Sequence, residues 1–219
     1  MNLVIIYNNF AKSNLTAGWG FSCLIIDDNQ KVLFDTGDKG KALLDNLKKL
    51  GFLAKEIDKI IISHEHWDHL GGLFDLINLQ SKATVYVLSS FSEDLKNRIR
   101  QKAKLIEITT PKKITKNIYT TGLIKNNPDE QSLILKTSKG IVVIVGCSHP
   151  GVGKILEIAQ KYGRIQAIIG GLHGFSNFEI LKDIEMIGAC HCTQYIKEIR
   201  EKFPGQFQEI KAGDLFEWS

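Results

Sequence analysis

The stretch that decides the fold is Ile61-Ile62-Ser63-His64-Glu65-His66-Trp67-Asp68-His69-Leu70-Gly71-Gly72, which holds three of the chain's six histidines. An apolar, β-branched run leads into it, and a segment of helical period follows over 70–79. The cluster is therefore predicted to occupy a strand-to-helix loop, where ligands of open α/β sheets gather. The other histidines, at 149, 173 and 191, lie in short stretches that contain glycine or cysteine.

The spacing within the cluster suits metal ligation. His64 and His66 are two residues apart, so in extended backbone their side chains point to the same side. Asp68 and His69 fall at the start of the predicted helix and face a second position. Neutral imidazoles and a carboxylate suit zinc, and also iron or manganese. We predict one or two divalent ions here, in preference to a set of core or capping histidines.

Composition limits the classes of function. Hydrophobic residues at 43% and charged residues at 24% describe an ordinary globular protein. The net charge of +4 comes from scattered lysines, so nucleic acid is not an expected partner.

No window approaches the roughly 18 apolar residues of a membrane span, and residues 1–10 lack a signal peptide's basic region. The four cysteines are too few and uneven for a disulfide framework. We expect a cytoplasmic protein acting on a small-molecule substrate, and the oligomeric state stays open.

Short β-branched runs alternate with segments of helical period along the chain. Strands are predicted at 3–7, 21–27, 31–35, 57–63, 84–88, 105–109, 117–121, 132–137, 141–146, 165–170, 188–192 and 207–211. Helices are predicted around 43–50, 70–79, 95–99, 155–162, 178–187 and 195–203. Turn residues at 28–30 and 138–140 predict two hairpins. These elements favour one α/β (α+β) domain over 1–219, with two mixed sheets packed together and helices outside.

Several motifs resemble the metallo-β-lactamase superfamily. SHEHWDHLGG (63–72) matches its His-x-His-x-Asp-His signature, and KVLFDTG (31–37) resembles its early strand, which ends here in Asp35. VIVGCSHPG (143–151) and GACHCT (188–193) resemble two later metal-ligand stretches. With GWGFSCLI (18–25) and IGGLHGF (169–175), they resemble the branch that contains the dihydropterin-methyl-ribofuranosylaminobenzene-phosphate synthases and metal-dependent hydrolases. The resemblance covers nearly the whole chain and implies an αβ/βα four-layer sandwich.

The resemblance also assigns roles to residues outside the cluster. It implies that His149 completes the site on His64 and His66, and that His191 binds the metal held by Asp68 and His69. Taken alone, His149 could instead be a loop histidine that caps the following helix. Asp35 would hydrogen-bond to the ligand loop and fix its geometry, although it could simply cap a turn with Thr36 and Gly37.

The cysteines mark a departure from the superfamily pattern. Cys147 stands where many members carry a bridging aspartate, and residues 110–148 contain no histidine. The bridging ligand is left open between the Cys147 thiolate, a hydroxide alone, or none. Strand alternation predicts that His191 faces the site while the sulfurs of Cys190 and Cys192 pack on the other face.

Metal-assisted hydrolysis is the function that these patterns favour. Asp68 would hold one metal and orient the nucleophile, and His173 would assist the leaving group. His173 could equally bind substrate, stabilise developing negative charge, or be an ordinary loop histidine.

Two alternatives from other classes stay open. One is a transferase of the pterin-synthase type, for which Lys39, Lys41 and Lys154 are the candidates for phosphate binding. The branch's usual glycine after Cys-His-Cys-Thr is Gln194 here, which departs from that assignment. The other is a non-catalytic metal-dependent binding or sensing protein.

Overall fold

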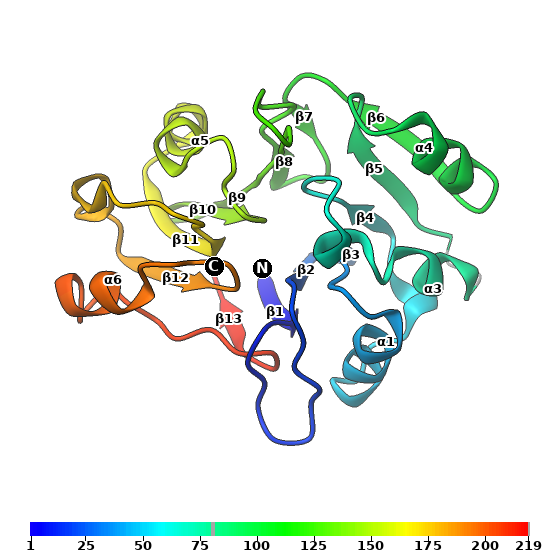
Figure 1. Cartoon of the computed structure of the whole chain (residues 1–219), viewed down its shortest axis with the longest axis horizontal. Helices are drawn as coiled ribbons and strands as arrows, with labels where there is room; N and C mark the ends of the chain where they lie inside the picture. The colour runs from blue at the N-terminus through cyan, green and yellow to red at the C-terminus, as the bar shows by residue number, and fades with distance from the viewer. Residues whose placement is uncertain (80–81, 219) are drawn as a thin grey trace.

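The computed structural model describes residues 1–79 and 82–218, and it contains two mixed β-sheets (Figure 1). The seven-stranded sheet has the order β13(Leu215–Glu217), β1(Asn2–Tyr7), β2(Ser22–Asp27), β3(Gln30–Phe34), β4(Lys59–Ile61), β5(Thr84–Leu88) and β6(Lys104–Ile108). The six-stranded sheet has the order β12(Met186–Cys190), β11(Ile165–Gly171), β10(Gly140–Val145), β9(Leu133–Thr137), β8(Ile118–Thr120) and β7(Lys112–Lys113). In each sheet an antiparallel part continues into parallel strands, from β3 to β6 and from β10 to β12.

Except for the short helix that follows the loop after β4, the helices lie on the outer side of each sheet (Figure 1). The helices are α1(Gly40–Lys49), α2(Trp67–Leu70), α3(Leu73–Asn78), α4(Glu93–Arg100), α5(Val152–Ala159) and α6(Ile196–Lys202), with 3-10 turns η1(Ala54–Glu56), η2(Gln160–Tyr162) and η3(Phe178–Leu181). The predicted fold class, two mixed sheets with helices outside, is confirmed. No helix in the described part of the chain is both long and apolar enough to cross a membrane.

Strand β10 shows how sequence alternation builds the layers. Val142 and Ile144 join the core between the two sheets, together with residues of the first sheet such as Phe34. Val143 and Val145 point the other way and pack with α5 in the outer core. Because both faces of the strand are covered, its sequence is a continuous apolar run, as expected for a strand buried on both sides.

Three predicted elements differ from the structure. The helix expected over 70–79 is split into α2 and α3 at Gly71 and Gly72, where a Cβ atom would stand 2.3 Å from the Asp38 carbonyl oxygen and 2.5 Å from that of Thr36. The helix expected over 178–187 is only the turn η3, followed by β12. The strand expected over 207–211 forms a single bridge, Phe207 to Ile187.

The two helices that differ from prediction do so for physical reasons. Glycine pairs allow close backbone approach, which here interrupts a helix. Leu181, Ile184 and Ile187 are spaced like a helix because all three reach the outer core, although each does so from a different local structure. Strand β13 was not predicted from the sequence. It is a short edge strand in which Leu215 is 55% exposed, so it does not show the alternation of buried and exposed residues that marks a strand.

A buried carboxylate joins the two sheets. Asp27, at the end of β2, accepts hydrogen bonds from the Thr115 hydroxyl, from the Asn117 backbone N–H at 3.2 Å and from the Asn117 amide at 2.8 Å. Thr115 and Asn117 lie between β7 and β8 in the other sheet. Burial would raise the pKa of Asp27, but these donors outweigh it and lower the pKa.

Replacing Asp27 with alanine should lower the free energy of unfolding by about 2–3 kcal/mol at pH 7, since three donors lose a charged acceptor. Because the folded-state pKa is lowered, the stabilisation is present above the unfolded pKa of about 4 and disappears as pH falls below it. Urea unfolding at pH 7 and pH 3 measures both effects. Exposed Asp183→Ala is the control, and an Asp27→Ala penalty that is equal at both pH values would contradict the assignment.

Candidate metal centre

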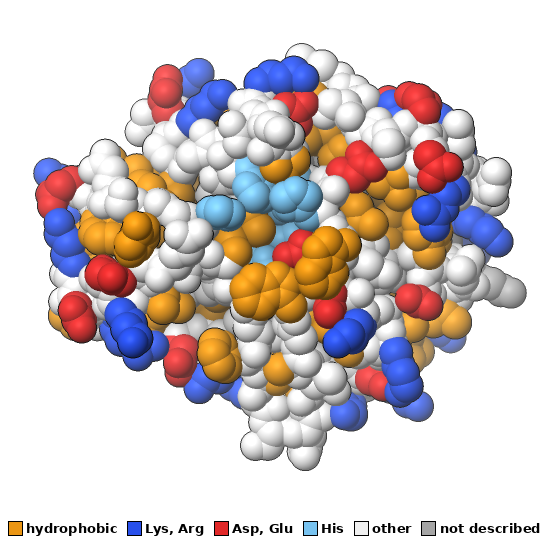
Figure 2. Space-filling model, viewed as in Figure 1, with side chains coloured by type: hydrophobic (Ala, Val, Ile, Leu, Met, Phe, Trp, Pro, Cys, Tyr) orange, Lys and Arg blue, Asp and Glu red, His pale blue; other side chains and the backbone are white. Residues whose placement is uncertain are grey.

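The candidate site lies where the carboxyl ends of five strands meet. The residues that follow β3, β4, β10, β11 and β12 are, in that order, Asp35, Ser63 with His64, Cys147 to His149, His173, and His191. His66, Asp68 and His69 enter from the loop after β4 and from α2. All six histidines of the chain therefore reach one region, which appears as the pale blue group in Figure 2.

The first group of donors consists of His64, His66 and His149, whose ligand atoms lie within 4.8 Å of one another. His64 Nε2 is 3.1 Å from His66 Nδ1, and the His149 ring is 4.8 Å from His64 and 4.9 Å from His66, centroid to centroid. His149 Nε2 is buried without a hydrogen-bond partner among the described residues. A buried polar atom without a partner is costly, so this nitrogen suits a cation.

The second group consists of Asp68, His69 and His191. His69 Nε2 is 3.2 Å from His191 Nε2, and Asp68 Oδ2 is 3.3 Å from His191 Nε2. Asp68 sits in the first turn of the short helix α2 and keeps 7% of its surface exposed. The structure thus brings the residues of the two predicted groups together from distant segments of the chain.

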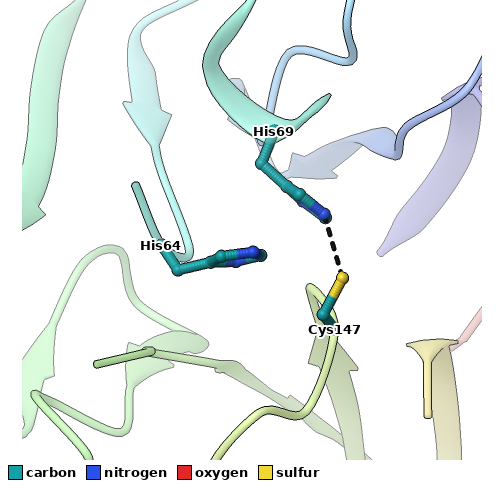
Figure 3. A group of neighbouring side chains, drawn as sticks. All are labelled: His64, His69 and Cys147. Carbon is teal, nitrogen blue, oxygen red and sulfur yellow. Dashed lines mark hydrogen bonds between the residues drawn. The ribbon is translucent and has the colours of Figure 1, made fainter. Parts of the chain in front are cut away.

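Cys147 lies between the two groups. Its sulfur is 3.2 Å from His69 Nε2, and it also forms a ligand-spaced set with His64 and His69. Figure 3 shows the side chains of His69 and Cys147 directed toward each other, with His64 pointing into the same space. The thiol therefore occupies a place from which it could contact ions in both groups.

Asp35 orients two of the histidines. Its carboxylate accepts hydrogen bonds from the Ser63 N–H, the Ser63 hydroxyl and His69 Nδ1, each at 2.7 Å. Because the Ser63 hydroxyl donates to Asp35, it accepts from His64 Nδ1 at 2.9 Å. Both rings are thereby held with the proton on Nδ1 and the lone pair of Nε2 facing the cluster.

Asn9 does the same for His191. Its amide nitrogen donates to the His191 carbonyl at 3.0 Å, which leaves its oxygen to accept from His191 Nδ1 at 3.1 Å. The Nε2 lone pairs of His69 and His191 thus face each other and the Asp68 carboxylate. Acceptors that converge in this way repel unless a proton or a cation lies among them. Ligands held about 2.1 Å from zinc stand about 3.4 Å apart, so the donor spacing fits a cation.

Burial keeps the imidazoles available as ligands. It lowers the pKa of His64 well below its usual value and, with the neighbouring imidazoles, lowers the pKa of His149 to about 4. Burial also lowers the pKa of His191. Burial would raise the pKa of Asp68, but a proton shared with His191 Nε2 outweighs this and holds the pKa at about 2. Near neutral pH His64, His149 and His191 are therefore neutral imidazoles, and Asp68 is an ionised carboxylate.

Asp35 has the opposite effect on His69. Burial alone would lower the pKa of His69, but the Asp35 carboxylate outweighs it and raises the pKa. An imidazole that is made more basic binds a proton or a metal ion more tightly. Asp35 therefore strengthens His69 as a donor besides orienting it.

Glu130 is a site residue that sequence analysis missed. It is fully buried, and its carboxylate accepts the backbone N–H groups of Gly146, Cys147 and Ser148 at 3.0–3.2 Å and that of His149 at 2.8 Å. These four bonds shape the loop that carries Cys147 and His149. The local sequence, Pro128-Asp129-Glu130-Gln131, reads as a solvated turn and carries no signal of this burial.

Cys192 is placed differently from the prediction. Cys190 packs in the core as expected. The Cys192 sulfur, in contrast, forms a group with Cys147 and His191 in which the possible ligand atoms lie within 4.8 Å of one another. The cause is the left-handed backbone of His191, with φ 52°, which ends the strand alternation on which the prediction rested. Gly171 permits the approach, since a Cβ there would stand 2.5 Å from this sulfur.

His173 lies at the edge of the cluster. Its exposed ring is 5.0 Å from that of His149, centroid to centroid. It borders a cavity of about 340 Å³ that is also lined by Ser148, Leu172 and Phe175. This position is compatible with contact to a substrate and does not place the ring among the ligand groups.

Comparison with known proteins places the chain in a family. The model of the metallo-β-lactamase superfamily matches residues 16–160. An uncharacterized protein of Methanocaldococcus jannaschii, MJ0448, is 30% identical over 201 residues, which span 77% of this chain and 78% of that protein. The chain belongs to the metallo-β-lactamase superfamily, as the motifs predicted.

Two further relatives bear on function. The 7,8-dihydropterin-6-methyl-4-(β-D-ribofuranosyl)-aminobenzene-5′-phosphate synthase of Methanocaldococcus jannaschii is 26% identical over 263 aligned positions, covering 91% of this chain and 90% of the synthase. The crystal structure of Tm1679, a metal-dependent hydrolase of the β-lactamase superfamily, superposes with a TM-score of 0.81 at 27% identity, covering 100% of this chain and 99% of that one. Similar chains thus include both a synthase and a hydrolase.

Substituting Asp35 with asparagine should weaken zinc binding about 10- to 100-fold, because an amide offers one acceptor oxygen where Ser63 and His69 need two. Competition with a chelator of known affinity measures the change, and circular dichroism checks the fold. Asp45→Asn, on the exposed side of α1, is the matched control. A folded Asp35→Asn protein with unchanged zinc affinity would show that Asp35 does not hold the ligands.

Proposed function

We propose that this chain is a metal-dependent hydrolase that cleaves an ester, phosphoester or related bond of a small-molecule substrate. The observation that carries the proposal is the convergence of His69, His191 and Asp68 with their lone pairs facing one another, beside a second group of three histidines. Imidazole, carboxylate and thiol donors together favour zinc. A cation bound there would lower the pKa of a water molecule and polarise an oxygen of the substrate.

The residues divide the remaining work. Ionised Asp68 keeps 7% of its surface exposed and can accept a hydrogen bond from an attacking water, which orients that water. His173, at the exposed edge, can give a proton to the leaving group. Cys147, between the groups, is a ligand that both ions could share. Glu130 and Asp35 hold the ligand-bearing loops in place.

A synthase is the second candidate, and the 26% identical relative favours it. Such an enzyme would need cationic groups for a diphosphate leaving group. Lys39 lies 3.6 Å from Asp38, Lys41 lies 2.8 Å from Asp45, and Lys154 donates to the Lys125 carbonyl at 3.1 Å. Since these ammonium groups already have oxygen partners, the synthase candidate is supported by the relative alone.

The protein, purified without added metal, should contain about two divalent ions per chain, mainly zinc. His149→Ala should lose one ion because it breaks the first group, and His191→Ala should lose the other. His173→Ala, which removes a histidine outside both groups, is the matched control and should keep both. Elemental analysis by mass spectrometry gives the stoichiometry. Metal loss in His173→Ala equal to that in the other two variants would refute this assignment of ligands.

Asp68→Asn should lower kcat on a responsive ester or phosphodiester by on the order of 10²–10⁴-fold while circular dichroism stays unchanged, since the anionic acceptor for the nucleophile is lost. A panel of nitrophenyl esters, phosphodiesters, thioesters and lactones identifies the responsive class. Near-normal turnover by Asp68→Asn would exclude the proposed role of this carboxylate.

Heavy-oxygen water separates the two candidate functions. Hydrolysis places one solvent oxygen in the product, whereas condensation with displacement of diphosphate does not. Label in the product supports the hydrolase. Turnover of a diphosphate substrate with an added amine or carbon nucleophile, without label in the coupled product, supports the synthase instead.

A further inference from the structure

Two exposed tryptophans belong to segments that carry or contact the second ligand group. Trp19 is 51% exposed and its ring lies 5.4 Å from that of His191, centroid to centroid. Trp67 is 62% exposed and begins α2, next in sequence to Asp68. Figure 2 shows large hydrophobic side chains along one edge of the histidine cluster, against a carboxylate.

The backbone around Trp19 is built to hold it close to Asp68. Gly20 has φ +141° and a Cβ there would stand 2.4 Å from the Asp68 carbonyl oxygen. On the other side of Trp19, a Cβ on Gly18 would overlap the Tyr7 hydroxyl, at 1.9 Å. Trp19 lies between two glycines whose positions leave no room for a side chain. Tight packing therefore fixes its main chain, although about half of the Trp19 side chain is exposed.

Because both indoles are exposed, the fold does not gain the free energy that burying them would contribute. Aromatic surface next to a polar site is instead typical of ligand binding, because an indole face stacks on flat rings. A cationic ligand group would be repelled by metal ions in the neighbouring donor groups. A flat, uncharged aromatic ring fits both the indole surface and this charge.

We propose that Trp19 and Trp67 form a stacking site for a planar aromatic or heteroaromatic ring of the substrate. This inference rests on the proposed function, since it places the ring beside the metal centre. The ring would lie on the side of Asp68 and His191. The cavity lined by His149 and His173 borders the first donor group and would receive the rest of the substrate.

Two non-hydrolysable probes test the stacking: 2-naphthylphosphonate and its saturated counterpart, decahydro-2-naphthylphosphonate. Both carry the same anionic group, and only the first has a flat π-face. Isothermal titration on the zinc-loaded protein should show tighter binding of the naphthyl compound. Trp19→Leu and Trp67→Leu should each weaken its binding about tenfold, while binding of the saturated compound changes less than about twofold.

Trp218→Leu is the matched control. Trp218 stacks on Phe216 and hydrogen-bonds through its backbone to Met1, at the end of β1 opposite Tyr7. This variant should bind both probes like the unmodified protein. Zinc content, measured for each variant, confirms that the ligand groups are intact.

Equal affinity for the two probes, or unchanged naphthyl binding in both active-site tryptophan variants, would overturn the stacking site. Because neither probe is turned over, these results do not depend on activity. Naphthyl preference without any hydrolytic turnover would count against the proposed hydrolase and leave the stacking site standing. Hydrolysis without a preference for flat rings would do the reverse.

Discussion

The loop that carries His64 to His69 depends on the hydrogen bonds that the Asp35 carboxylate accepts. His69 donates one of these bonds and Ser63 donates two. The Ser63 hydroxyl in turn accepts a hydrogen bond from His64 and so orients that ring. A buried carboxylate is tolerated only when it is well hydrogen-bonded, and here all its bonds run to the ligand loop. A single buried charge thus selects the tautomer of one histidine in each donor group.

Left-handed backbone also recurs at the strand ends that form the site. Among the described residues outside glycine, those with positive φ include Asp35, Ser148, His173 and His191, at the ends of four different strands. Left-handed backbone is costly for such residues and tends to persist at functional sites. Each such residue turns the chain sharply out of its strand, which brings side chains of the following loop toward the centre. Hydrogen bonds compensate locally, as where the Ser148 hydroxyl donates to the Gly171 carbonyl at 2.7 Å.

Left-handed backbone and long-range packing limited which parts of the site could be predicted from sequence. His64, His66, Asp68 and His69 are close in the chain, so local spacing was enough to group them. The direction of Cys192 was mispredicted because left-handed backbone is uncommon outside glycine, so even a histidine, which is enriched there, does not predict it. Glu130 was missed because its burial depends on the packing of segments far apart in sequence. The helix expected at 178–187 failed for a related reason, since apolar spacing reports burial and not the local hydrogen bonding.

Cys147 gives the centre its particular character. Where many superfamily members place a carboxylate between the donor groups, this chain places a thiol whose pKa is raised by the nearby Cys192 and by burial. A divalent cation reverses that tendency, because a coordinated thiol loses its proton. In the proposed function, two divalent cations would face two anionic ligands, Asp68 and Cys147, and a third negative charge on Asp35 beside His69. The centre would remain positive, and positive charge in a buried pocket attracts anionic groups strongly. Together with the indoles of Trp19 and Trp67, this charge favours a substrate that joins a flat ring to an anionic group, and it disfavours a purely apolar ester.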